Sequence, residues 1–136
     1  MVFLDTNIVV DLLDARGPGV RERYDEARRL SMRLALSTIA LFELRYGAAN
    51  SDRIERNTRA LDALLDEGFD LIPFDTADAA EAGAIRAHLR RAGTLIGPYD
   101  MLIAAQARRR GAILVTSNGR EFERFPGLIV TDWARA

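Results

Sequence analysis

Apolar and polar residues occur in alternating blocks along this chain, and the blocks predict strands and helices in turn. Short continuous apolar runs that end in a polar turn are typical of strands buried on both faces. Because such runs alternate with helical segments, the pattern favours an α/β fold, a three-layer sandwich with a mostly parallel central sheet flanked by helices. The strands are expected within "VFL", "RLALS", "FDLIPFD", "AILVTSN" and "LIVTDW".

Longer segments with apolar residues three and four apart predict the helices. Ser37 and Thr38 precede one helix as capping residues, and Thr76 is the expected N-cap of another. Gly68 and Gly93 mark two helix ends, and "GPG" at 17–19 separates the first two helices. The helices are expected in "IVVDLLD" after Thr6, about 20–33, "IALFELRYGAA", "SDRIERNTRALDALLDEGF", "TADAAEAGAIRAHLRRAG", "YDMLIAAQARRRG" and, as a short turn, "REFERF".

Length and composition indicate an ordinary globular protein. The chain has 136 residues, of which 49% are hydrophobic and 29% charged, so we expect one domain over residues 1–136. No apolar run reaches the roughly 20 residues that cross a bilayer, and the first residues lack the basic segment of a signal peptide. We therefore expect a cytoplasmic protein that does not interact with membranes.

Missing residue types exclude several kinds of chemistry. The absence of cysteine excludes disulfides, thiolate zinc sites and cysteine nucleophiles. The single histidine, His88, lies between arginines on a predicted helix, where a solvated side chain is expected, and no G-x-S-x-G turn is present for a serine triad. Without lysine there is no Walker phosphate loop. At a net charge of −1, any contact with a polyanion depends on local arginines.

Acidic and amide residues follow the predicted strands. Ligands bind at the carboxyl ends of the strands in open α/β sheets, so these residues are the candidates for a site. Asp5 directly follows the first strand, and Glu43 lies in the helix after the second. Asp100 begins a helix after "IGP", whereas Asn118 and Glu121 follow the fourth strand.

Each acid also has a structural interpretation. Asp5 can cap the helix that begins at Thr6, and Asp100 lies in a first helical turn, where the helix dipole favours acids. Glu43 is flanked by apolar residues on a helix that looks buried, so its charge needs a partner. Arg45 is one candidate partner and a metal ion is the other. A site built only from oxygen atoms suits Mg²⁺ or Mn²⁺ better than Zn²⁺.

Four segments together resemble a PIN domain, and specifically the VapC family of toxin ribonucleases from bacterial toxin–antitoxin pairs. These segments are "FLDTNIVVDLL", "STIALFELRYG", "LIGPYDMLIAAQA" and "LVTSNGREFERFPGLIVTDW". They occur in the order found in the family and extend from residue 2 to residue 133. The resemblance therefore covers almost the whole chain.

The resemblance implies a role for each candidate residue. Asp5 would be the first metal ligand, oriented by the two residues after it, with Glu43 the second acid and Asp100 the third. Thr116 and the turn after it would complete the site. Many family members carry an acid two residues after that threonine, where this chain has Asn118. Either Asn118 or Glu121 would then be the fourth residue of the site.

The resemblance also implies an activity and partners. The expected reaction is metal-dependent cleavage of RNA by a metal-activated water, which leaves a 5′-phosphate and a 3′-hydroxyl, with Mg²⁺ or Mn²⁺ as cofactor. Flanking phosphates would be held by arginines such as Arg45, Arg120 or Arg124. The implied partners are a VapB-type antitoxin, whose C-terminal segment covers the acidic site, and a second copy of the chain in a homodimer. Asp11, Asp75 and Asp78 are interpreted as surface or capping acids.

The sequence leaves three other classes of function open. Receiver domains and haloacid-type phosphatases also place an aspartate after the first strand, but both usually need a lysine near the site. A housekeeping PIN nuclease in RNA processing would share the acids. A non-catalytic PIN-like module that binds RNA or protein is favoured only by Asn118, the amide at an often acidic position.

Overall fold

The five strands of the computed structural model form one sheet in which every pairing of neighbours is parallel. The strand order is β3-β2-β1-β4-β5, with β1 in the centre, where all three of its residues are buried. The expected parallel sheet is thus confirmed, although most strands are shorter than the apolar runs that predicted them. The structure describes residues 1–134, and the strands are β1 Val2–Leu4, β2 Leu34–Ser37, β3 Asp70–Ile72, β4 Ile113–Val115 and β5 Ile129–Thr131.

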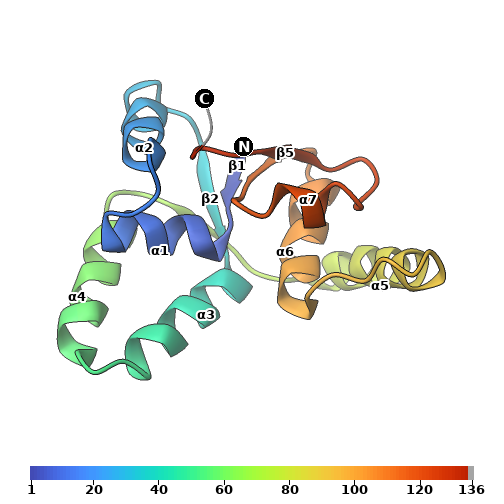
Figure 1. Ribbon diagram of the computed structural model, residues 1–136, viewed down its shortest axis with the longest axis horizontal. Helices are drawn as coiled ribbons and strands as arrows, with labels where there is room; N and C mark the ends of the chain where they lie inside the picture. The colour runs from blue at the N-terminus through green and yellow to red at the C-terminus, as the bar shows by residue number, and fades with distance from the viewer. Residues whose placement is uncertain (135–136) are drawn as a thin grey trace.

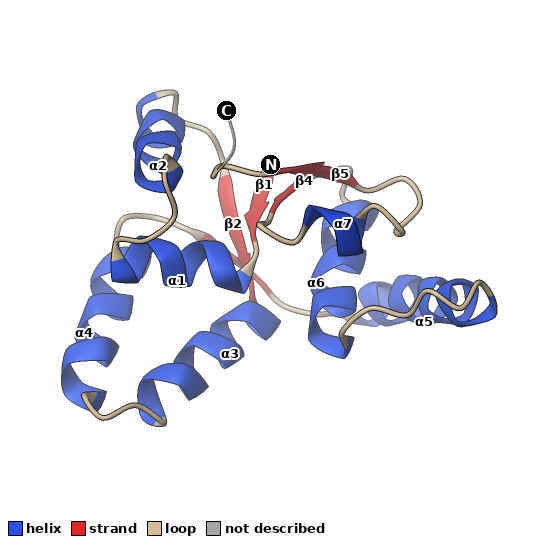
Figure 2. Cartoon of the chain, viewed as in Figure 1, coloured by secondary structure: helices blue, strands red, loops and turns tan. Residues whose placement is uncertain are grey.

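Helices cover both faces of the sheet and complete the three expected layers. Figures 1 and 2 show α1 to α4 on one side of the strands and α5 to α7 on the other. No helix in the described part of the chain is long and apolar enough to cross a membrane. The helices are α1 Thr6–Asp14, α2 Val20–Arg29, α3 Thr38–Ala49, α4 Ile54–Leu65, α5 Thr76–Arg91, α6 Pro98–Arg109 and α7 Gly119–Phe122.

The strand order places a topological switch point beside β1. From β1 the chain continues through β2 to β3 in one direction, and it returns to β4 and β5 on the other side of β1. Helices that leave β1 and β4 therefore lie on opposite faces, and in sheets of this kind ligands bind at the carboxyl ends of the strands beside the switch point. Asp5 follows β1 and Thr116 follows β4, so both lie at this end of the sheet.

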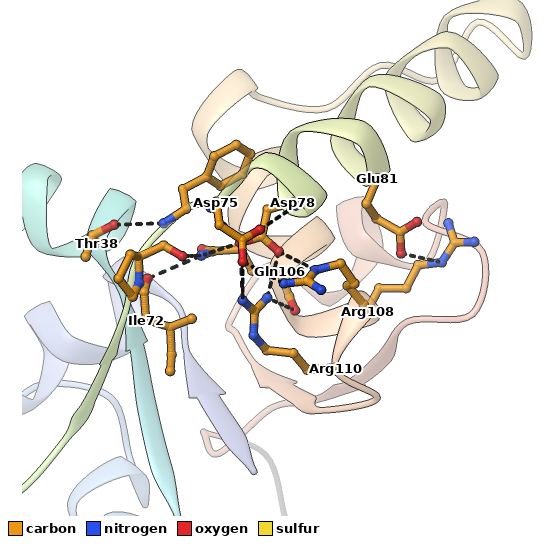
Figure 3. Close-up of polar contacts among 11 residues, drawn as sticks. Thr38, Ile72, Asp75, Asp78, Glu81, Gln106, Arg108 and Arg110 are labelled. Atoms are coloured by element: carbon orange, nitrogen blue, oxygen red, sulfur yellow. Dashed lines mark hydrogen bonds and ion pairs between the residues drawn. The ribbon is translucent and has the colours of Figure 1, made fainter.

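A buried ion-pair network joins α5 to α6, as Figure 3 shows. Asp78 is completely buried, and its Oδ1 accepts hydrogen bonds at 2.7 Å from Arg109 Nε and from Arg110 Nη1. Gln106 on α6 donates hydrogen bonds to the backbone carbonyls of Ile72, the last residue of β3, and of Pro73 directly after it. Of the two expected roles for Asp78, surface or capping, the capping role is confirmed, and its ion pairs with the two arginines were not predicted. Its two arginine partners lie more than 30 residues away in the sequence, so local patterns give no sign of them.

Some predicted element ends also differ from the structure. Asp75, and not Thr76, is the N-cap of α5, because Asp75 and Asp78 form a reciprocal capping box. The helix expected over about 20–33 ends at Arg29, and Ser31 has a φ of 54°, which an α-helix cannot contain. Residues 135 and 136 of the expected single domain lie outside the described part of the chain.

Candidate active site

Asp5 is both a helix cap and a buried acid, with only 1% of its surface exposed. Its Oδ1 accepts a hydrogen bond from the Thr6 backbone N–H at 2.8 Å, which caps α1. Its Oδ2 accepts another at 2.8 Å from the Thr116 hydroxyl. Burial raises the pKa of Asp5 despite these two hydrogen bonds, and the charge of Glu121 raises it further. A cation beside Asp5 would stabilise its ionised form.

Thr6 connects Asp5 to Glu43 on α3. While its backbone N–H binds Asp5, its hydroxyl donates a hydrogen bond to Glu43 Oε1 at 2.9 Å. Burial raises the pKa of Glu43, the Thr6 hydroxyl lowers it, and the charge of Asp5 raises it again. The two carboxyl groups are therefore close enough to repel each other across one threonine.

The surroundings of Glu43 differ from two expectations. The helix α3 is not buried all round, since Phe42 directly before Glu43 is 52% exposed. Arg45 donates to Asp62 Oδ1 at 2.7 Å and belongs to an exposed ion pair between α3 and α4, so it is not the counter-ion of Glu43. Gly47 lies one helical turn after Glu43 on α3, and a Cβ added there would meet no atom within 4 Å, so this part of the helix surface is open.

Asp100 is the third residue of α6, where its charge also favours the helix dipole. Burial and then the charges of Asp5, Glu121 and Glu43 raise the pKa of Asp100 to about 6. All three of the other candidate acids thus act on Asp100. This mutual repulsion shows that side chains from four separate parts of the chain surround one region.

Gly97, which the sequence reasoning missed, lies where two of the acids meet. Its backbone N–H donates to Glu121 Oε1 at 2.8 Å. A Cβ at this position would lie 3.3 Å from Asp100 Oδ2 and 3.9 Å from Glu121 Oε1. A glycine directly before Pro98, which begins α6, is the sequence signal that could have marked this close approach.

The turn after β4 brings Thr116, Asn118 and Glu121 to the same region. The Thr116 hydroxyl accepts a hydrogen bond from the Asn118 backbone N–H at 3.0 Å while it donates to Asp5. The Asn118 side chain donates from Nδ2 to Glu121 Oε2 at 3.1 Å. Of the two candidates for the fourth position, Glu121 therefore presents a carboxylate near the acids, and Asn118 is directed at Glu121.

The donor atoms suit a hard divalent cation, because every candidate side chain offers oxygen. Within residues 1–134, however, no three acidic or histidine side chains are already arranged around a common point where an ion would bind. Burial first and then the neighbouring acids raise the pKa values of Asp5, Glu43 and Asp100, so a bound cation would stabilise their ionised forms. The residues thus fit Mg²⁺ or Mn²⁺ by chemistry, and ion binding would require the carboxylates to approach one another.

The other arginines expected near the site, and the single histidine, lie in different parts of the structure. Arg120 is exposed on α7 and lines a polar pocket of about 650 Å³ beside Asn118. Arg124 donates to the backbone carbonyl of Leu95 at 3.5 Å, in the segment that leads into α6. His88 is exposed on α5, as expected for a solvated side chain.

The sequence of the chain matches the family model of the PIN domain over residues 2–128. A similar protein is the tRNA(fMet)-specific endonuclease VapC of Shigella flexneri, which is 40% identical over 132 residues, 97% of this chain and 97% of the relative. The match therefore covers almost all of both chains.

Solved structures show the same likeness in three dimensions. VapBC2 from Rickettsia felis, bound to a DNA fragment from its promoter, matches with a TM-score of 0.90 and 34% identity, covering 98% of this chain and 99% of the other. DNA-bound VapBC from Salmonella typhimurium matches with a TM-score of 0.88 and 39% identity, covering 97% of each chain. Sequence and fold therefore indicate the same family.

Proposed function

This chain belongs to the PIN-domain family and, within it, to the VapC ribonucleases, and from this membership we propose that it is the toxin of a type II toxin–antitoxin pair that cleaves RNA with Mg²⁺ or Mn²⁺. The observation that carries the proposal is how the acids are brought together at the switch point of the sheet. Thr6 joins Asp5 to Glu43 through hydrogen bonds, and Gly97 lies against both Asp100 and Glu121. Four acids at this end of the sheet, with Arg45 already engaged elsewhere, would be stabilised by a divalent cation.

Asp5, Glu43 and Asp100 are the proposed metal ligands, with Glu121 as the fourth acid. When bound, Mg²⁺ or Mn²⁺ supplies a Lewis acid that lowers the pKa of a water molecule and stabilises charge on the scissile phosphate. Thr6 and Thr116 orient the carboxylates of Glu43 and Asp5 through hydrogen bonds. Because these side chains are already held, they lose less rotational freedom when an ion binds. Hydrolysis leaves a 5′-phosphate and a 3′-hydroxyl.

Initiator tRNA is the proposed substrate, because relatives that are 40% identical over almost the full length are named for that tRNA. Arg120 supports contact with RNA, since it is exposed next to the turn that carries Asn118 and Glu121. Its guanidinium can bind a phosphate that flanks the cleaved bond. Arg45 is unsuited to this role while it is paired with Asp62.

A VapB-type antitoxin is the proposed partner. A groove of about 660 Å³ between α1, α3 and α4 is lined by apolar residues such as Leu13, Leu44 and Leu61, and Glu43 also contributes to it. A segment of the antitoxin in this groove would run toward the acids and cover them. The proposed assembly also contains a second toxin chain, so that the toxin forms a homodimer.

The proposed function is tested by incubating the purified protein with initiator tRNA and, in parallel, with elongator methionine tRNA. Each reaction is run with Mg²⁺, with Mn²⁺ and with EDTA. We expect cleavage of initiator tRNA that requires a divalent ion and stops when the antitoxin is added. Absence of cleavage under every metal condition would favour the non-catalytic binding module. Cleavage that no co-encoded small protein inhibits would instead favour a housekeeping nuclease.

A further inference from the structure

The amide of Asn118 is directed at the carboxylate of Glu121. We infer that Asn118 is a positioning residue that holds Glu121 toward the other acids and does not itself bind the metal. The inference rests on the proposed function, because it assigns a role within the same site. It follows from how the backbone of Asn118, its amide and the carboxylate of Glu121 are held.

The backbone of Asn118 is fixed on both sides. Its N–H donates to the Thr116 hydroxyl at 3.0 Å. Its carbonyl accepts hydrogen bonds from the backbone N–H groups of Glu121 at 3.1 Å and Phe122 at 3.4 Å, at the start of α7. Phe122 is completely buried, so the short helix is anchored in the core. The Cα of Asn118 therefore has a defined position from which its side chain can act.

The side chain of Asn118 can satisfy Glu121 in only one orientation. Because an ionised carboxylate only accepts hydrogen bonds, the amide must present its NH₂ group, as the 3.1 Å contact from Nδ2 to Glu121 Oε2 shows. The amide oxygen branches from the same carbon in a different direction, so it is not the atom that faces Glu121 Oε2. In this orientation the amide group acts on Glu121 as a donor.

Glu121 is held from a second direction by the start of α6. The Gly97 N–H donates to Oε1 at 2.8 Å, while Asn118 binds Oε2. One donor belongs to the turn after β4 and the other to the segment that leads to Asp100. Glu121 thus links the two segments, and its charge acts on both Asp5 and Asp100. Loss of either donor would allow the glutamate to rotate toward solvent.

Replacing Asn118 with an acid distinguishes between two roles for this residue, one that positions Glu121 and one that binds the metal. If the residue bound the metal, Asn118→Asp would add a charge to the site and strengthen ion binding. In the positioning role, the new carboxylate would face Glu121, remove its donor and repel it. The two roles therefore predict opposite effects of the same substitution.

The experiment measures Mn²⁺ affinity by titration calorimetry, without RNA, on the full-length chain and five variants. These are Asn118→Ala, Asn118→Asp, Glu121→Gln, the Asn118→Ala/Glu121→Gln double variant and Asn57→Ala. The last is a matched control, since Asn57 is an exposed asparagine on α4 whose amide donates to Ser51 Oγ at 2.9 Å. Thermal unfolding of each variant verifies that it is folded.

We expect Asn118→Ala to weaken Mn²⁺ binding about fivefold to tenfold, a range typical of residues that orient metal ligands. Asn118→Asp should bind no better than Asn118→Ala, Asn57→Ala should match the parent, and the double variant should bind as weakly as Glu121→Gln alone. For RNA cleavage, Asn118→Ala should lower kcat and leave KM unchanged. Tighter binding by Asn118→Asp, or losses that multiply in the double variant, would overturn the positioning role.

The design distinguishes failure of this inference from failure of the proposed function. If the parent binds Mn²⁺ and cleaves RNA while the single losses multiply, only the role of Asn118 is overturned. If the parent neither binds Mn²⁺ nor cleaves RNA, the metal site itself is overturned together with its positioning residue.

Discussion

The Thr116 hydroxyl donates a hydrogen bond to Asp5 Oδ2 at 2.8 Å across 111 residues of sequence. Both residues are buried, and they follow the neighbouring parallel strands β4 and β1. Because the same hydroxyl accepts from the Asn118 backbone, one oxygen atom links the first acid to the turn that carries Glu121. The two ends of the chain are thus coupled at the site.

Thr116→Val tests this link, since valine keeps the branched shape and removes the hydroxyl. We expect the free energy of unfolding to fall by about 1–3 kcal/mol, because one oxygen of Asp5 remains buried without its donor. RNA cleavage should fall about tenfold or more as the pKa of Asp5 rises and its carboxylate loses orientation. Thr116→Ser keeps the hydroxyl and is the control in urea denaturation and cleavage assays. Equal activity of the two variants would contradict a role for the hydroxyl.

Gly97→Ala tests the close approach of α6 to the acids. The φ of −53° at Gly97 suits alanine, so the substitution causes no backbone strain. The new Cβ would lie 3.3 Å from Asp100 Oδ2, and we expect it to displace that carboxylate and lower cleavage about threefold to tenfold. Gly83→Ala, on α5 with open space around it, should leave cleavage unchanged. Unaltered cleavage by Gly97→Ala would show that this contact does not matter.

Asp78→Asn tests the network between α5 and α6. The substitution leaves Arg109 and Arg110 without their buried counter-charge, and both are only partly exposed. We expect a loss of about 2–4 kcal/mol in the free energy of unfolding, measured with urea. Asp62→Asn, in the exposed pair with Arg45, should cost less than about 1 kcal/mol. Similar small losses in both variants would contradict the importance of burial.

The same network predicts a loss of stability in acid. Burial alone would raise the pKa of Asp78, but hydrogen bonds from Arg110, the Asp75 backbone and Arg109 outweigh it and hold the pKa well below its usual range. A lowered pKa gives stability that is fully present above about pH 5 and is lost as the pH falls through the folded-state pKa. Urea denaturation between about pH 6 and about pH 2 should show a steeper loss of stability in the parent than in Asp78→Asn. Parallel curves would contradict the pairing.

Asp100 should affect the free energy of unfolding with the opposite pH dependence when EDTA keeps the protein free of metal, and Asp100→Asn tests this. Burial and three neighbouring acids raise the pKa of Asp100 from 3.8 to about 6, so the metal-free fold is disfavoured as the pH rises through that range. At about pH 8 the variant should be more stable than the parent by about 1 kcal/mol, a value reduced for the partial exposure of the side chain. Below about pH 4 the two should converge. A less stable variant at pH 8 would show that repulsion at Asp100 is minor.

That the candidate acids lie near one another could be predicted because parallel strands end at one edge of a sheet. Asp5 directly follows one buried strand, and Glu43 lies in the helix after the next strand. Because ligands bind at the carboxyl ends of such strands, the sequence alone makes both residues candidates. Their electrostatic coupling agrees with that reasoning. The spacing of the residues predicted only an acidic site. The role expected for each acid came from the resemblance to a known family.

Contacts between distant segments could not be predicted in the same way. Asp78 has the sequence position of a helix cap, and nothing near it shows that Arg109 and Arg110 reach it. The pairing of Arg45 with Asp62 likewise depends on how α3 and α4 pack. The direction of the Asn118 amide depends on the turn that holds it. These features arise from tertiary packing, which a local pattern does not contain.

The central claim is that Asp5 and the acids around it form one metal-dependent site for RNA cleavage. The most direct measurement compares the parent with Asp5→Asn, by Mn²⁺ titration calorimetry and by the rate of initiator tRNA cleavage on the same preparations. We expect the variant to remain folded, to bind Mn²⁺ at least about tenfold more weakly, and to cleave at least about 100-fold more slowly. A folded variant that binds Mn²⁺ and cleaves RNA as well as the parent would show that Asp5 is not part of a metal-dependent site.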